Sequence, residues 1–139
     1  MENRAVGWTC MAAGIASGLV LGLWSFDGPV EVPDWIGDYA STPRRMVRLA
    51  HIALMALGII NILLGRELPD LALGPGTKRA VSVTMNIGNV FLPLTLFAGA
   101  LFMPLKYLMA IPALCVLYAV STMAYASLRR QPRGAGGGR

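Results

Sequence analysis

Long stretches without a charged residue constrain this chain more than any other feature of its sequence. Residues 5–26, 49–65, 80–105 and 107–128 contain no Asp, Glu, Lys or Arg, and together they make up 87 of the 139 residues. A helix needs about 20 apolar residues to cross the hydrocarbon core of a bilayer, which is about 30 Å thick. The sequence therefore predicts an all-α membrane protein with four transmembrane helices in an up-down bundle, a short inner loop and a longer acidic outer loop.

Charged residues are scarce in the chain as a whole. They make up 14 % of it, whereas soluble domains carry about 25 %. This composition excludes a soluble α/β enzyme, a nucleic-acid-binding protein and a secreted domain held by disulfides. The sequence has no catalytic triad, phosphate-binding glycine loop or dinucleotide fingerprint, so we expect the protein not to be an enzyme. Cys10 and Cys115 lie in separate apolar stretches and are interpreted as small packing residues.

Capping and helix-breaking residues predict the helix boundaries. Ser41-Thr42-Pro43 is typical of a helix start, with a hydroxyl cap and an early proline. Thr77 is expected to cap the third span, and Pro93 to kink it by removing a hydrogen-bond donor. A basic, glycine-rich tail, residues 129–139, is expected to be disordered. The single transmembrane domain, residues 1–128, is predicted to contain spans at about 5–25, 43–64, 79–102 and 106–128.

The cations are unevenly divided between the two ends of such a bundle. With four spans, both termini and the middle loop lie on one side and carry eight of the 12 Lys and Arg residues. The opposite side carries Arg44, Arg45, Arg48 and Lys106. Lys and Arg are enriched in cytoplasmic loops. We therefore predict a protein of the cytoplasmic or inner membrane with both termini in the cytoplasm.

Three glycines are spaced four residues apart in the first span. Gly14, Gly18 and Gly22 clear one helix face and let another backbone approach closely. The approaching helix belongs either to the same chain or to a partner subunit or second copy.

The most specific group of side chains lies in the second span. Helical spacing places Arg44, Arg48, His51 and Met55 on one face. Arginines in the first turns of a helix oppose its dipole, so we expect anionic neighbours. Lipid phosphates or the acidic groups of a cofactor are candidates. So are the four carboxylates of the outer loop, Asp27, Glu31, Asp34 and Asp38.

Three interpretations of the only histidine remain open. His51 could hydrogen-bond to a hydroxyl or carbonyl and fix helix packing. It could instead bind haem or a quinone, with Arg44 and Arg48 neutralising acidic groups and Met55 as a second iron ligand. A proton relay is the third interpretation, because histidine titrates near neutrality. We expect no cofactor; haem or quinone is the alternative, and no metal can be named from the sequence.

A second polar group is predicted nearer the inner end of the bundle. Asn61, Asn86 and Asn89 lie at similar depths, and Ser121 and Thr122 approach them from the fourth span. Such a cluster either joins helices by hydrogen bonds or binds a transported solute. Pro93 favours a binding role, because the Asn89 carbonyl that it frees requires a partner in lipid.

These observations favour a structural or accessory function. The spans carry few ionisable residues, and the first has a glycine face suited to close packing. We expect a small integral membrane protein that forms a subunit of a larger membrane complex or a homo-oligomer. A redox protein centred on His51 and a small transporter using the asparagines are the alternatives. The expected partners are the lipid bilayer and another membrane subunit or second copy, and not nucleic acid.

Overall fold

The computed structural model describes residues 2–25 and 28–129, and these residues form helices and no β-strand. Four of the helices are long and apolar enough to cross a membrane, which confirms the predicted all-α class and suggests an integral membrane protein. A 3-10 turn, Leu68–Asp70, extends the second, and another, Met103–Met109, precedes the fourth. The four are α1 (Asn3–Gly22), α2 (Thr42–Glu67), α3 (Pro75–Leu101) and α4 (Ala110–Leu128).

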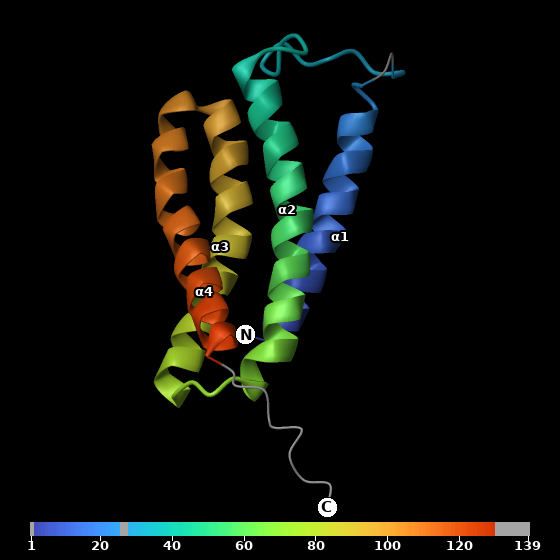
Figure 1. The fold of residues 1–139 in the computed structure, drawn as a ribbon. Coiled ribbons are helices and arrows are strands. Elements are labelled where there is room, and N and C mark those ends of the chain that lie inside the picture. Colours follow the sequence, from blue (N-terminus) through green and yellow to red (C-terminus); the bar gives the residue numbers. More distant parts are fainter. Residues whose placement is uncertain (1, 26–27, 130–139) are drawn as a thin grey trace, which may run out of the picture.

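The four helices lie side by side, and successive helices run in opposite directions (Figure 1). The start of α1, the connection between α2 and α3, and the end of α4 lie at one end of the molecule. We call this the inner end and the other the outer end. α2 packs against α1 and α3, α1 also contacts α3, and α4 packs mainly against α3.

Local sequence explains where the helices begin. The Ser41 hydroxyl accepts a hydrogen bond from the Arg44 backbone N–H at 3.3 Å, which is the predicted cap of α2. The expected cap at Thr77 is wrong. α3 begins at Pro75, directly after Gly74, because proline has no N–H to leave unpaired in the first turn.

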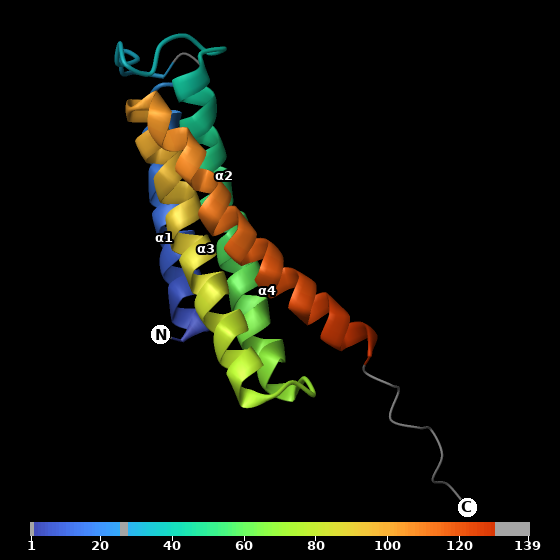
Figure 2. The same cartoon turned by 90° about the vertical axis from the view of Figure 1, so that its left-hand side faces the viewer.

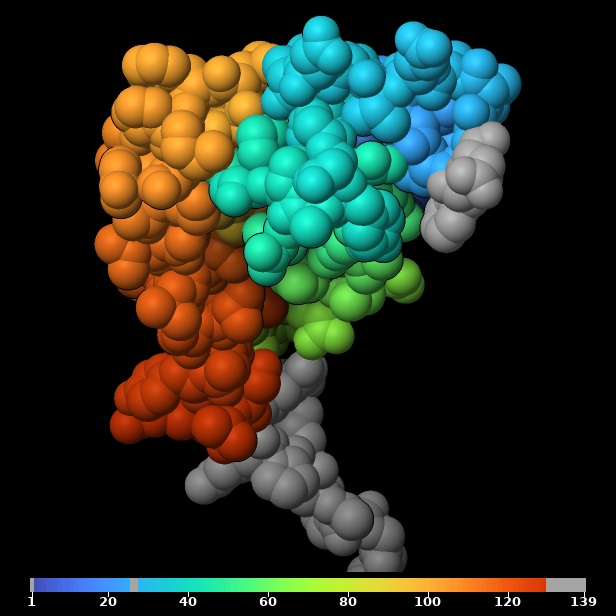
Figure 3. Space-filling view, turned by 90° about the horizontal axis from the view of Figure 1, so that it is seen from above, coloured from blue at the N-terminus to red at the C-terminus, as the bar shows by residue number. Residues whose placement is uncertain are grey.

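The segment at residues 28–41 covers the outer ends of α1 and α2, beside the connection from α3 to α4 (Figure 3). Its Ile36 is 1 % exposed and fixes the segment to the bundle. Gly37 adopts a φ of 69°, a conformation that side chains with a Cβ rarely take. The segment therefore turns tightly next to its buried anchor.

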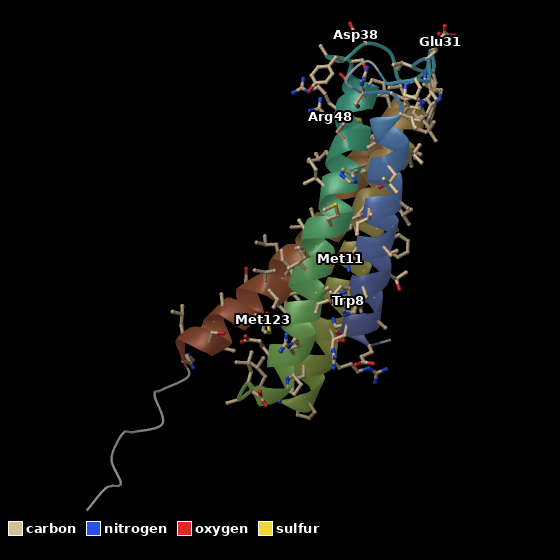
Figure 4. All side chains as sticks on the ribbon, turned by 90° about the vertical axis from the view of Figure 1, so that its right-hand side faces the viewer. Trp8, Met11, Glu31, Asp38, Arg48 and Met123 are labelled. Carbon is tan, nitrogen blue, oxygen red and sulfur yellow. The ribbon has the colours of Figure 1, made fainter. Side chains whose placement is uncertain are left out.

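Apolar side chains fill the interior but also cover the outside of the bundle. One interior cluster joins α2, α3 and α4 through Leu57, Val81, Met85 and Ala119, and a second lies nearer the outer end. Many other large apolar side chains are exposed. Aromatic side chains are also exposed, among them Trp8 towards the inner end (Figure 4). Such a surface is suited to lipid rather than water.

α4 is packed less closely than the other helices. In an apolar 18-residue window of the span Met103–Leu128, 11 % of the residues are buried, compared with 22 % in that of α1 and 33 % in those of α2 and α3. Pro112 and Ala119 are its buried residues. Figure 2 shows α4 leaning away from the other three helices towards its C-terminal end. The molecule therefore consists of a three-helix core and a fourth helix attached along α3.

Candidate functional site

A network of buried amides joins α1, α2 and α3 near the inner end. Asn61 on α2 is fully buried. Its Oδ1 accepts a hydrogen bond from Asn3 Nδ2 at 2.7 Å, and its Nδ2 donates to Asn86 Oδ1 at 2.9 Å. Two of the three predicted asparagines are thus directly bonded, and Asn61 is the centre of the network.

Two members of this network were missed by sequence reasoning. Asn3 is 6 % exposed; it donates to the Ser82 carbonyl at 3.3 Å and accepts from the Ser82 hydroxyl. Because Asn3 stands next to charged residues at the start of the chain, its sequence context indicates an exposed position. The spacing of Asn3, Gly7 and Gly14 could have shown that all three share a helix face.

The third predicted asparagine lies apart from these hydrogen bonds. The Asn89 side chain is fully buried, and neither its Nδ2 nor its Oδ1 has a hydrogen-bond partner among the described residues. The backbone carbonyl of Asn89 is the one that Pro93 leaves without its helical donor. Cys10 Sγ on α1 lies 3.9 Å from this carbonyl oxygen and donates a weak hydrogen bond to it. Cys10 therefore does more than fill space.

The remaining predicted members of this cluster lie elsewhere. Ser121 is exposed on α4. The Thr122 hydroxyl donates to the Tyr118 carbonyl of its own helix at 2.8 Å. The polar cluster is consequently built by three helices, and α4 does not contribute the hydroxyls expected from it.

His51 is held between α1 and α2 nearer the outer end. Its Nδ1 lies 2.8 Å from the Gly14 carbonyl oxygen and 3.3 Å from Ser17 Oγ. A carbonyl can only accept, so Nδ1 carries a proton in this arrangement. A Cβ on Gly18 would lie 2.5 Å from Cε1 of the ring, so the imidazole rests directly on this glycine.

The four residues predicted to share one face of α2 lie in two environments. His51 and Met55 pack on α1, whereas the two arginines lie near the Tyr39 ring. Met55, like His51, packs on α1, because a Cβ on Gly14 would lie 2.6 Å from Met55 Cγ. Arg44 is 9 % exposed and donates from Nη2 to the Trp24 carbonyl at 2.7 Å. Arg48 places its guanidinium 4.5 Å from the centre of the Tyr39 ring, and Arg44 lies 5.4 Å from the same ring.

Arg44 and Arg48, for which anionic neighbours are expected, lie beside an aromatic ring, and Arg44 also lies beside a backbone carbonyl. A backbone carbonyl and the negative face of an aromatic ring both attract a guanidinium. Of the four candidate carboxylates, Asp27 lies outside the described residues. Residues 130–139 of the predicted basic tail also lie outside them. Figure 4 shows Glu31 and Asp38 at the outer end, the end that also carries Arg48.

The glycine face of α1 packs mainly within the chain. Gly14 and Gly18 lie against α2, whereas a Cβ on Gly22 would meet no described atom within 4 Å. A close backbone approach between α1 and α2 involves two other glycines, Gly7 and Gly58, which are not among the three predicted ones. A Cβ on Gly7 would lie 2.7 Å from the Gly58 carbonyl oxygen, and one on Gly58 would lie 2.8 Å from that of Gly7.

The contacts described at this site are hydrogen bonds among amides, hydroxyls and backbone carbonyls. Within residues 2–25 and 28–129, no group of three or more His, Cys, Asp or Glu side chains could hold a metal ion. Comparison with protein-family models, curated proteins and solved structures found no match. The function must therefore be argued from the contacts themselves.

Proposed function

We propose that the protein is a polytopic integral membrane protein built as an up-down four-helix bundle, with its inner end facing the cytoplasm. The inner end of the described chain carries five cations, one more than the outer end. They are Arg4, Arg66, Lys78, Arg79 and Arg129. The outer segment at residues 28–41 carries Glu31, Asp34 and Asp38. Positively charged loops stay on the cytoplasmic side, whereas acidic residues have little influence on orientation.

Within that membrane we propose a structural function, as an accessory subunit of a larger complex or of a homo-oligomer. One observation carries this proposal: side-chain hydrogen bonds join α1 to α2 and α2 to α3, while α4 leaves most of its surface unpacked. Asn61, for example, is fully buried and donates to Asn86. Leu114 and Leu117 on α4 are both more than 60 % exposed. This face of α4 is therefore available for van der Waals packing against a helix of another subunit, the contact by which helices associate in lipid.

The proposal is tested by measuring the mass of the protein purified from its native membrane in mild detergent. A stoichiometric partner or a defined oligomer is the expected result. Leu117→Trp, which enlarges the exposed face of α4, should disperse that assembly. Val83→Trp, on an exposed part of α3, is the matched control and should leave it intact. A stable monomer with no associated protein would contradict the proposal.

A specific observation favours one alternative, a quinone-binding protein. A hollow of about 210 Å³ near the outer end is lined by Ser17, Trp24, Trp35 and Phe97, among others. The Ser17 hydroxyl is next to His51 Nδ1. Aromatic walls with one polar edge suit a flat ring that carries a carbonyl oxygen.

Quinone added to the purified protein should quench tryptophan fluorescence in a saturable manner if this alternative is right. Ser17→Ala should then weaken the binding, whereas Thr9→Ala, on the exposed part of α1, should not. Quenching that rises linearly with quinone and is the same in both variants would remove the alternative. For haem, the contacts of His51 and Met55 with α1 mean that a coordinated porphyrin would have to separate α1 from α2.

A further inference from the structure

An apolar groove opens between α2 and α4 at the inner end of the molecule. It is about 330 Å³ in volume, and both helices contribute to its walls. Its apolar lining consists of Ile60, Leu63 and Leu64 from α2 and Val120, Met123 and Ala124 from α4. The groove exists because α4 leans away from the core there (Figure 2), and Figure 4 shows Met123 on that part of α4.

A charged hollow adjoins the groove at the end of α2. This hollow is about 370 Å³ in volume and is lined by Leu63, Arg66, Glu67 and Asp70. Leu63 and Glu67 line both spaces, so the two lie next to each other. The Arg66 guanidinium and the carboxylates of Glu67 and Asp70 therefore lie at the membrane-surface end of the apolar groove. A molecule that fills both spaces must be amphipathic.

The dimensions of the groove match one leaflet of a bilayer. From Ile60 to Glu67 a helix rises about 10 Å, at 1.5 Å per residue. Half of the hydrocarbon core is about 15 Å thick. An acyl chain lying in the groove would therefore be covered for about two thirds of its path through the leaflet, with its headgroup beside Arg66, Glu67 and Asp70.

The charges at the mouth select among headgroups. Arg66 suits a phosphate, because a guanidinium donates several N–H groups in one plane. Glu67 and Asp70 can only accept hydrogen bonds when ionised, so they require a donor. A primary ammonium supplies three N–H donors, whereas a quaternary ammonium supplies none. A headgroup with a phosphate and no amine brings no positive charge to the two carboxylates, so at best it offers them the weaker hydrogen bonds of neutral hydroxyls.

We propose that this groove binds a phospholipid whose headgroup carries both a phosphate and a primary amine, as in phosphatidylethanolamine. The phosphate lies at Arg66, the ammonium at Glu67 and Asp70, and an acyl chain between α2 and α4. The site is complete within one copy of the chain, so it does not depend on the proposed subunit function.

The test is native mass spectrometry of the detergent-purified protein with phosphatidylethanolamine, phosphatidylcholine and phosphatidylglycerol of identical acyl chains. The ethanolamine lipid should bind about tenfold more tightly than the choline lipid, the effect of about one charge-assisted hydrogen bond. Glu67→Gln combined with Asp70→Asn should abolish this preference and leave binding of the choline lipid unchanged. Asp34→Asn combined with Asp38→Asn, at the outer end, is the matched control and should keep the preference.

A second variant tests the apolar part of the site. Val120→Trp should fill the groove and remove the bound lipid, whereas Leu114→Trp, on an exposed part of α4, should not. Equal binding of the three lipids by the native protein would overturn the proposal. So would a preference that survives removal of both inner carboxylates, or loss of a dimer rather than of lipid in Val120→Trp, which would show that a second copy occupies the groove.

Discussion

The two sides of α3 hold their neighbouring helices by different means. On one side, α1 and α2 are joined to each other by touching glycines and to α3 by amide hydrogen bonds from Asn3 and Asn61. On the other side, α4 packs on α3 through apolar contacts and lies close to the small residue Gly88, and Pro112 and Ala119 are its buried residues. Apolar burial does not favour helix association in lipid, because the lipid is equally apolar. Close backbone approach and hydrogen bonds therefore decide which helices are firmly held.

The largest effect is expected from closing the approach between α1 and α2. Gly58→Ala places a methyl group 2.8 Å from the Gly7 carbonyl oxygen, a backbone atom that can move only with its helix. We expect a loss of about 3 kcal/mol in the free energy of unfolding, at the upper end of ordinary overpacking costs. The measurement is equilibrium unfolding in mixed detergent micelles.

Gly22→Ala is the control for this variant, because its methyl group would meet no described atom within 4 Å. Its unfolding free energy should lie within about 0.5 kcal/mol of that of the native protein. Equal losses in the two variants would show that α1 and α2 are not held by backbone contact.

An intermediate effect is expected from the buried amides, and two positions form a matched pair. Asn61 and Asn89 are both fully buried, but Asn61 makes two amide hydrogen bonds while the Asn89 side chain makes none with the described residues. Asn61→Leu should cost about 1–3 kcal/mol, because it removes the hydrogen bonds that Asn61 makes with the buried Asn3 and with Asn86. Asn89→Leu should be neutral or stabilising, because it removes a buried amide that has no partner among the described residues.

The same unfolding measurement compares the two variants. A substantial loss of stability in Asn89→Leu would show that this amide is bound to something else in the membrane, such as an internal water molecule. That result would make Asn89 part of a wider polar path and would strengthen the transporter hypothesis. Equal losses at both positions would contradict the distinction drawn between them.

The smallest effect on stability is expected on the other side of α3. Gly88→Ala brings a methyl group into overlap with Val116 Cγ2, on a branched side chain with little rotamer freedom, and to 3.1 Å from the Pro112 carbonyl oxygen, so α4 has to move as a unit. We expect α4 to shift outwards while the unfolding free energy changes by less than about 1 kcal/mol. Spin labels at Cys115 and at a cysteine replacing Leu63, in a Cys10→Ala background, would measure the separation of α2 and α4.

A wider distance distribution with an unchanged unfolding transition is the predicted outcome for this variant. If Gly88→Ala destabilises the protein as much as Gly58→Ala, then α4 belongs to the core as firmly as α1 does, and the comparison between the two sides fails.

Much of the fold could be predicted because it depends on local properties of the chain. The absence of charge identifies the four long helices, and the cap of α2 at Ser41 follows from side-chain chemistry within one turn. The site was predicted only in part, since its contacts depend on which helices become neighbours. Asn61 and Asn86 could be placed at one depth by counting residues. The contact of Asn3 with Ser82 depends on α1 and α3 being neighbours, which no local pattern specifies.

The same limit explains why Cys10 was underestimated. The need of the Asn89 carbonyl for a donor follows from Pro93 alone, but the identity of that donor depends on the register between α1 and α3. Asn86 and Asn89 lie about one helical turn apart on α3, yet the Asn86 side chain belongs to the amide network and the Asn89 side chain does not. Depth along the membrane can be counted from the sequence, whereas direction around a helix axis depends on its neighbours.

The hydrogen bonds that unite α1, α2 and α3 have a consequence for how the protein is made. All of their partners lie between Asn3 and Asn89, so the ribosome has already added every group they require before it reaches the first residue of α4. None of these contacts waits for a group on α4. A released chain that stops after α3 would still hold every partner of these hydrogen bonds, and the last helix joins a unit whose polar contacts need nothing from it.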